Sequence, residues 1–92
     1  MKGDFKMILK LFTKKDCPKC PNAKKLCANL KSQISNLKLE YYDIDTVDGM
    51  AEAAFYSVMS TPSIILFDKA GKELGSWRGE VPTEKAILNL IK

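Results

Sequence analysis

Two runs of the chain are apolar at nearly every position, and they constrain the fold more than any other feature. Residues 6–12 have apolar side chains at both odd and even positions, and so on both faces of a strand. Ser63–Phe67 is continuously apolar after its first residue. A strand that is apolar on both faces has to be covered by other elements on both sides. The sequence therefore predicts an α/β fold, with these two strands at the centre of a sheet and helices on both faces.

Three segments have apolar residues at helical spacing. The first begins at Cys17, with Pro18 in its first turn, because a proline at that position loses no hydrogen bond. The second has a stripe that we expect to face the core, formed by Met50, Ala51, Ala54, Phe55 and Val58. The third is opened by Pro82, and its expected inner face consists of Ala86, Ile87, Leu90 and Ile91.

Two further strands complete the pattern. Residues 37–44 alternate apolar with charged, which is typical of a strand near the edge of a sheet. Residues 68–71 have turn chemistry, so 72–78 should return antiparallel to the preceding strand. The predicted order is β-α-β-α-β-β-α. Since a strand–helix–strand unit forms a parallel pair, we expect a four-stranded mixed sheet in the order 2-1-3-4, within a single domain of residues 1–92.

Length and composition exclude several classes of protein. A chain of 92 residues that is 46% apolar and 28% charged is typical of one small globular domain. Because the chain has no histidine, Ser-His and Cys-His nucleophile pairs and His-ligated metals are excluded. No apolar run approaches the roughly 20 residues that cross a membrane, and residues 1–6 lack the apolar region of a signal peptide. We therefore expect a cytoplasmic protein without a membrane partner.

Charge is unevenly distributed along the chain, whose net charge is +4. Residues 10–31 carry seven lysines against Asp16, whereas residues 40–52 carry five acidic residues and no basic one. Such segments are most often solvated faces, although a basic side would attract acidic partner proteins. The lysines are not interleaved with aromatic residues in the way that RNA binding requires, so we expect no nucleic acid partner.

Two cysteines, Cys17 and Cys20, stand where the first strand passes into the first helix. The partial positive charge of a helix N-terminus stabilises a thiolate, which is the nucleophilic form of cysteine. A separation of three residues lets the two sulfurs close a small disulfide ring. We expect Cys17 to be the exposed, attacking thiol and Cys20 to lie inside and resolve a mixed disulfide. Cys27 is most simply a small buried residue, with a regulatory role or a second disulfide as the alternative.

The same cysteines leave a non-enzymatic alternative open, a metal- or cluster-binding module. Zinc and iron–sulfur clusters take four ligands, and with three cysteines the chain would need a dimer or external thiols to complete the set. Pro18 also stiffens the loop against wrapping around a cluster. We expect no metal and no other cofactor. The neighbouring Lys14, Lys15 and Lys19 are either a solvated loop or charge support for the thiolate and contact with an anionic partner.

With these features together, the chain resembles the thioredoxin and glutaredoxin superfamily. The resemblance spans residues 6–91 and rests on the Cys17–Cys20 motif, on Thr61-Pro62 before a central apolar strand, and on the order of the elements. It implies a thioredoxin-like fold, a cis peptide bond before Pro62, and a substrate chain that pairs with the backbone of Thr61. The substrate-binding residues that we predict are Thr61, Pro62, Met59, Lys14 and Lys15, with Pro18 and Lys19 supporting the cysteines.

The resemblance implies a thiol–disulfide oxidoreductase that reduces disulfide-containing proteins. Because nothing in the sequence requires a dimer, we expect a monomer. The chain length and the Cys-Pro-x-Cys form of the motif are similar to those of glutaredoxins. Residues 67–73 and Arg78-Gly79 are more similar to the corresponding segments of thioredoxins. Small archaeal and anaerobe thioredoxins combine both sets of features. Ser76 and its neighbours replace the glycine-rich, acidic stretch that holds glutathione in glutaredoxins, and Arg78 would oppose the ammonium of glutathione if it faced the site. We therefore expect recycling by a thioredoxin reductase, with a glutathione-dependent glutaredoxin as the alternative.

Overall fold

The computed structural model describes residues 7–91, and the strands and helices follow in the predicted order. Their bounds are β1 (Met7–Thr13), α1 (Cys20–Gln33), β2 (Leu37–Asp43), α2 (Val47–Phe55), β3 (Ser63–Asp68), β4 (Glu73–Arg78) and α3 (Glu84–Ile91). Lys6, at the start of the expected first strand, and the expectation about residues 1–6 lie outside the described residues. None of the helices in this part of the chain is long and apolar enough to cross a membrane.

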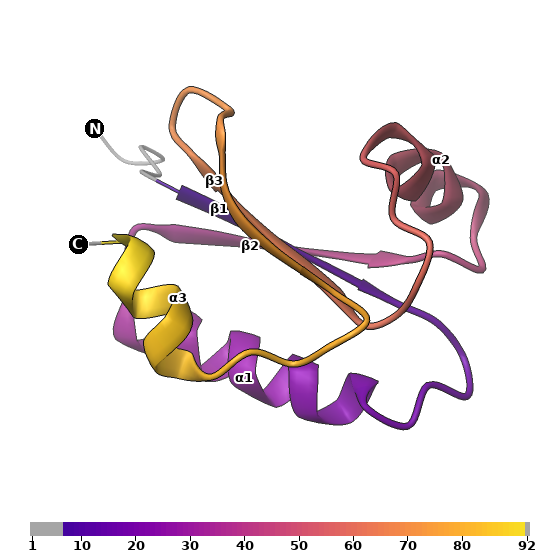
Figure 1. The fold of residues 1–92 in the computed structure, drawn as a ribbon, viewed down its shortest axis with the longest axis horizontal. Coiled ribbons are helices and arrows are strands. Elements are labelled where there is room, and N and C mark those ends of the chain that lie inside the picture. The colour runs from indigo at the N-terminus through magenta and orange to yellow at the C-terminus, as the bar shows by residue number, and fades with distance from the viewer. Residues whose placement is uncertain (1–6, 92) are drawn as a thin grey trace.

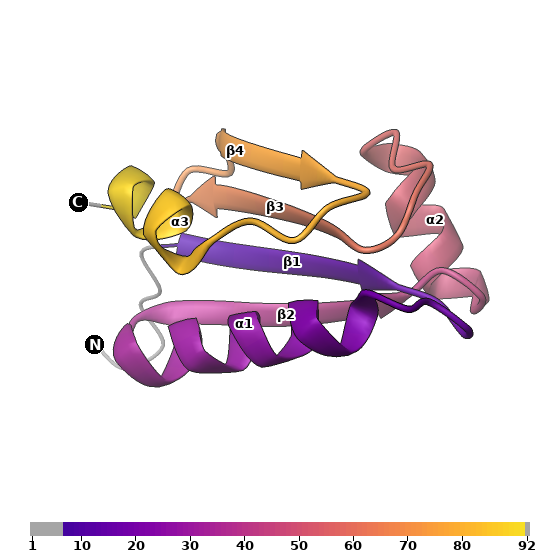
Figure 2. The ribbon, with the colours of Figure 1, turned by 60° about the horizontal axis from the view of Figure 1, so that its bottom comes forward.

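The four strands form one mixed sheet in the order β2-β1-β3-β4, which confirms the predicted topology (Figure 2). β1 runs parallel to β2 and antiparallel to β3, with Phe12 of β1 opposite Ser63 of β3. β3 and β4 form an antiparallel hairpin. Its turn contains Gly71, whose positive φ of 89° suits a residue without a side chain. The two strands that are apolar on both alternations therefore lie at the centre of the sheet.

Helices cover both faces of the sheet, with α1 and α3 on one side and α2 on the other (Figure 1). Because successive side chains of a strand point to opposite faces, β1 contributes to two cores. Leu9 and Leu11 pack in the core that includes Leu30 of α1. Phe12 packs in the core that includes Ala53 of α2. The predicted α/β class is thus confirmed, and the residue-by-residue alternation of β1 explains why both of its faces are apolar.

The inner face of α2 differs from the predicted one. The members of the expected stripe that are exposed are Met50, Ala51, Ala54 and Phe55. The cause lies at the start of the helix, where the Thr46 hydroxyl accepts a hydrogen bond from the N–H of Gly49. Gly49 is buried, and a Cβ atom at this position would overlap the carbonyl oxygen of Asp43. The glycine lets α2 approach the end of β2 closely, which turns the apolar stripe outwards.

Two smaller differences concern the other helices. α1 begins at Cys20 rather than Cys17, because the residues between them form a single turn in which the carbonyl of Cys17 accepts the N–H of Cys20 at 3.3 Å. Pro21, and not Pro18, therefore occupies the first turn of the helix, where a missing N–H needs no partner. In α3, Leu90 of the expected inner face is 41% exposed.

Candidate active site

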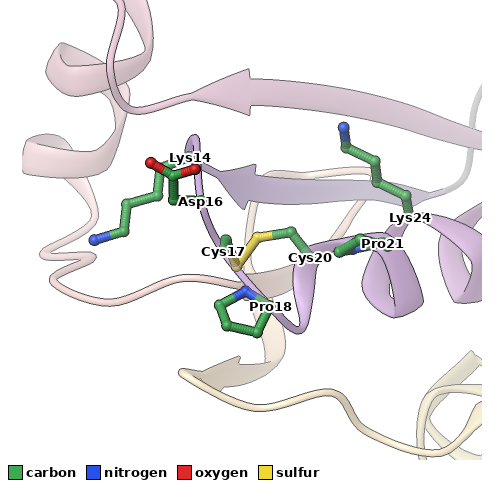
Figure 3. A pocket seen from close by; sticks show the side chains of 7 residues that line it. All are labelled: Lys14, Asp16, Cys17, Pro18, Cys20, Pro21 and Lys24. Carbon is green, nitrogen blue, oxygen red and sulfur yellow. A yellow bond between two sulfur atoms is a disulfide. The ribbon is translucent and has the colours of Figure 1, made fainter.

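The cysteine pair lies beyond the end of β1, where the chain turns into α1 (Figure 3). Cys17 and Cys20 are joined by a disulfide, and their Cα atoms are 5.4 Å apart. Cys20, at the first position of α1, is only 3% exposed, whereas Cys17 is half-buried. An incoming molecule can therefore reach the sulfur of Cys17 more readily than that of Cys20, which is the difference in exposure that the sequence predicts.

The loop that presents Cys17 is short and tied to a neighbouring loop. The N–H of Lys15 donates a hydrogen bond to the carboxylate of Asp45 at 3.0 Å, which links the β1–α1 loop to the β2–α2 loop. Asp16 adopts a positive φ of 57°, a conformation that aspartate tolerates better than most residues. With these two features the chain reverses within a few residues and places Cys17 immediately before the first turn of α1.

The N-terminal end of α1 is the main electrostatic feature beside the disulfide. Its first turn contains no acidic residue, and no side chain caps it. The partial positive charge of the helix end is therefore available to stabilise a thiolate. The ammonium group of Lys14, by contrast, points away from the sulfur atoms (Figure 3). In the disulfide-bonded form, the expected charge support from Lys14 is thus not seen.

An open pocket lies over the disulfide (Figure 3). It is lined by Lys14, Asp16, Cys17, Pro18, Cys20, Pro21 and Lys24. Four of the predicted site residues meet here, while Lys15 and Lys19 are exposed and do not line the pocket. The sequence analysis did not identify Lys24. It stands four residues after Cys20, so helical spacing is the signal that places it beside the pocket.

The α2–β3 loop reaches the same end of the sheet as the cysteine pair (Figures 1 and 2). The Thr61–Pro62 peptide bond is cis, and Pro62 is fully buried. The carbonyl of Pro62 accepts a hydrogen bond from the N–H of Gly79 at 2.8 Å, and the hydroxyl of Ser63 donates to the carbonyl of Ser60 at 2.7 Å. Within residues 7–91, no backbone hydrogen bond uses the N–H or the carbonyl of Thr61. These two groups are thus free to pair with another chain.

The structure divides the predicted substrate-binding residues between separate places. Thr61 and Pro62 do not line the pocket at the disulfide, and neither does Met59. The Met59 side chain is 89% exposed and borders a second groove, between α2 and the loop that follows it. We call this the α2 groove, and its lining residues are Ile44, Met50, Ala53, Ala54, Ser57, Val58 and Met59.

A cluster of charged and aromatic residues lies on the α2 face of the sheet, and the sequence analysis did not identify it. The ammonium of Lys10 donates hydrogen bonds to the carboxylate of Glu52 and to the hydroxyl of Tyr56, the latter at 3.2 Å. Burial alone would lower the pKa of Lys10, but the hydrogen bonds to Glu52 and Tyr56 outweigh it and raise the pKa above its ordinary value. The only signal in the sequence is a lysine in the middle of a central strand.

Cys27 is a free thiol that is fully buried on the inner side of α1. Burial raises the pKa of this thiol to about 12, so it is neutral at physiological pH. These properties agree with its interpretation as a small buried residue. In the part of the chain that the structure describes, no three cysteine, aspartate or glutamate side chains are grouped so that they could hold a metal ion.

The sequence is similar to thioredoxins over nearly its whole length. The model of the thioredoxin domain family matches residues 7–92. A thioredoxin from Methanocaldococcus jannaschii is 27% identical over 88 residues, which cover 95% of this chain and 94% of that protein. A probable thioredoxin from Archaeoglobus fulgidus is 29% identical over 63 residues, which cover 68% of each chain.

Solved structures show the same fold. A mutant thioredoxin from Halobacterium salinarum superposes with a TM-score of 0.80 at 24% identity, over 96% of this chain and 74% of that one. The thioredoxin of Fasciola hepatica superposes with a TM-score of 0.75 at 24% identity, over 94% of this chain and 78% of that one. Because the family match extends over the whole described fold and includes the cysteine pair, this chain belongs to the thioredoxin domain family.

Proposed function

We propose that this protein reduces disulfides in other proteins through the dithiol form of Cys17 and Cys20. The observation that carries the proposal is the unequal exposure of the pair at a helix N-terminus, with Cys17 half-buried and Cys20 covered. An exposed thiolate attacks first, and a covered thiol one turn away is protected from side reactions while it waits. Membership of the thioredoxin family supports the same chemistry.

The reaction transfers two electrons from the dithiol to the substrate. The Cys17 thiolate attacks one sulfur of the substrate disulfide, so that a mixed disulfide forms and the other substrate sulfur leaves as a thiolate that takes up a proton. The Cys20 thiol then gives up its proton and attacks the Cys17 sulfur, which releases the second substrate thiol. The substrate is reduced to two thiols, and the Cys17–Cys20 disulfide is left on the protein.

The substrate binds as an extended chain against the α2–β3 loop. The free N–H and carbonyl of Thr61 support this, because backbone hydrogen bonds hold a chain irrespective of its side chains. The pairing register between β1 and β3 also supports binding of the substrate at this loop. Phe12, the last residue but one of β1, lies opposite Ser63, so Thr61 and Pro62 stand beside the strand end from which the Cys17 loop departs. Binding at Thr61 would bring the substrate cysteine towards the sulfur of Cys17.

Electrons return to the protein from a thioredoxin reductase rather than from glutathione. Support comes from Ser76 and its neighbours, which provide neither the second glycine nor the acid that would hold the ammonium of glutathione. Repulsion of the glutathione ammonium by Arg78, which was expected if that side chain faced the site, does not contribute to this preference. Its guanidinium donates to the Ser76 hydroxyl at 2.5 Å and to the carbonyl of Tyr56 at 3.0 Å, at the end of α2. We assign the reaction to the cytoplasm, where thiols stay reduced, and to a monomer without a cofactor.

Reduction of insulin in the presence of dithiothreitol tests the proposal, with precipitation of the insulin B chain as the signal. Wild-type protein should accelerate precipitation, and Cys17→Ser should abolish the acceleration because serine cannot exchange with a disulfide. Cys20→Ser should accumulate a mixed disulfide with the substrate. Cys27→Ala is the matched control and should keep its activity. Wild-type activity in Cys17→Ser would overturn the proposal.

A further inference from the structure

Four exposed lysines lie beside the disulfide or along the first two turns of α1. Lys14 belongs to the β1–α1 loop, and Lys19 immediately precedes the helix. Lys24 and Lys25 follow in the second turn, about 6 and 8 Å beyond Cys20 along the helix axis. We call these four lysines the lysine face. It is a strongly charged surface next to the reactive sulfurs, and the proposed exchange of disulfides does not use it.

The charge of the lysine face is not neutralised by the protein itself. None of the four ammonium groups forms an ion pair within residues 7–91. α1 contains no acidic residue, and along the chain no acid stands between Asp16 and Glu40. Asp16 lines the pocket at the disulfide and opposes part of the charge. We leave Lys15 out of the face, because its N–H is bonded to the Asp45 carboxylate, which offsets its charge. The remaining positive charge is available to another molecule.

The ammonium groups are placed to meet a partner rather than the cysteine sulfurs. Figure 3 shows those of Lys14 and Lys24 on opposite sides of the disulfide, and neither points towards the sulfur atoms. Both lysines line the open pocket, so a molecule that approaches Cys17 through this pocket passes between them. At physiological ionic strength a charge acts over about 8 Å. Acidic groups close to the disulfide of the incoming molecule therefore come within range of the lysines.

We propose that the lysine face docks substrate proteins that carry acidic residues beside their disulfide, and thereby determines which substrates are reduced fastest. This inference rests on the proposed disulfide reduction. Backbone pairing at Thr61 would hold an extended chain irrespective of its side chains, so selection among substrates needs a surface beside it. Complementary charge supplies such selection, mainly through the rate of encounter. A nucleic acid fits less well, because α1 has no aromatic residue on which a base could stack.

The test measures how fast the reduced protein opens short peptides, each joined through its cysteine to an uncharged, chromogenic pyridinethiol. The cysteine is flanked on both sides by glutamate, glutamine or lysine. Each rate is divided by that of dithiothreitol in the same buffer, which corrects for the reactivity of the peptide disulfide itself. In about 10 mM salt, where screening is weak, the glutamate peptide should react about tenfold faster than the glutamine peptide. The lysine peptide should react more slowly than both.

Salt provides the first check of the electrostatic origin. In about 1 M salt a charge acts over only about 3 Å, so the ratio of the glutamate rate to the glutamine rate should approach one. A ratio that salt does not change would contradict docking by charge. Equal corrected rates for the glutamate and glutamine peptides in low salt would overturn the inference.

Variants locate the preference on the protein. Lys24→Glu/Lys25→Glu should remove or reverse the preference for glutamate. Lys69→Glu/Lys72→Glu is the matched control, because it changes the net charge equally but lies in the exposed β3–β4 turn, at the opposite end of the sheet (Figure 2). It should keep the preference, and an equal loss in both double variants would mean that net charge alone is responsible. Circular dichroism checks that both are folded.

Asp16→Asn gives a prediction of the opposite sign. Asparagine tolerates the positive φ of this position as aspartate does, and the substitution removes the charge that opposes the lysine face. The preference for glutamate should increase about twofold, as expected for the loss of one exposed charge. No increase would contradict the role of charge at the pocket.

Further measurements separate the possible failures. The glutamine peptide is uncharged, so if Cys17→Ser opens it as fast as the wild type does, the proposed function fails. If only the wild type opens it but glutamate is not preferred, docking alone fails. Sedimentation tests a second copy as the occupant, through its acidic residues 43–48, and fluorescence anisotropy tests a single-stranded RNA. A complex of either kind that Lys24→Glu/Lys25→Glu dissociates, while that variant keeps the glutamate preference, would overturn the inference.

Discussion

The ammonium of Lys10 lies 3.2 Å from the hydroxyl of Tyr56, and this contact joins the central strand β1 to the residue that follows α2. The same ammonium bonds to Glu52 and lies 4.7 Å from the centre of the Tyr56 ring and 5.4 Å from that of Phe67. A lysine side chain that is only 12% exposed thus finds two acidic partners, Glu52 and, at 3.7 Å, Glu40, together with a hydroxyl and aromatic faces. The α2 layer is held to the sheet by a charged contact within apolar surroundings.

Replacing Lys10 by methionine should destabilise the protein, because it leaves the half-buried Glu52 carboxylate without its cation. The expected loss is about 1–3 kcal/mol in the free energy of unfolding, measured by urea denaturation. The double variant Lys10→Met/Glu52→Gln should recover part of that loss.

Lys38→Met provides the control for this prediction. Lys38 also pairs with a glutamate, Glu40, at 3.3 Å, but its side chain is 47% exposed. An exposed pair contributes at most about 1 kcal/mol. If the two single variants lost the same stability, the Lys10 contact would be no stronger than a surface ion pair.

Cys27 should make the protein less stable at alkaline pH. The pKa of its thiol is about 12 in the folded protein against an ordinary value of 9.0. Between these two values the unfolded chain has lost the proton that the folded chain keeps, so stability falls as pH rises from about 9 to about 12. Urea denaturation of the disulfide-bonded protein across this range should show a steeper fall for the wild type than for Cys27→Ala. Lys10 and Tyr42 contribute to both proteins alike, so parallel curves would contradict the prediction.

Gly49→Ala should destabilise the protein although alanine favours helices. Helix propensity alone would add about 1 kcal/mol of stability. The new Cβ would overlap the carbonyl of Asp43, so α2 has to move and the core around Ala53 has to loosen. We expect a net loss of about 2 kcal/mol or more in urea denaturation, within the range of overpacked sites. Ala51→Gly, at an exposed position of the same helix, should lose only about 1 kcal/mol. A stabilised Gly49→Ala would mean that α2 does not approach β2 so closely.

The electron donor can be identified by comparing two coupled assays. A flavin-type thioredoxin reductase with its nicotinamide cofactor should sustain turnover on insulin. Glutathione with glutathione reductase should give little turnover on hydroxyethyl disulfide, because the chain lacks the acid that would bind the glutathione ammonium. Turnover with glutathione as fast as that of a glutaredoxin, with none from the reductase, would reverse the assignment and leave the roles of Cys17 and Cys20 unchanged.

The features that could be predicted from the sequence are those that local patterns determine. The central position of β1 and β3 follows from apolar residues on both of their faces, and the location of Cys17 and Cys20 follows from a strand that leads into a helix. The α2 face could not be predicted in this way. Periodicity assumes that the most apolar stripe turns inwards, whereas the close approach at Gly49 depends on the backbone of another element.

The same reason explains which parts of the site the sequence did not reveal. The partners of Lys10 are 42 and 46 residues away along the chain, so no local pattern connects them. The α2 groove depends on the rotation of one helix about its axis, and Met50 was therefore expected in the core. Met59 was expected to bind substrate, but its separation from the pocket at the disulfide requires the tertiary structure.

The contacts that attach α2 through Glu52, Gly49 and the carbonyl of Tyr56 all lie on its inner side or at its ends, and this arrangement has a consequence for how the protein can diverge. Outward residues such as Met50 and Ala54 can be exchanged without disturbing Lys10, Gly49 or the carbonyl of Tyr56. The outward surface of α2 can therefore diverge, or be engineered, one substitution at a time on an unchanged scaffold. Laboratory diversification of this surface would start from these outward positions of one short helix.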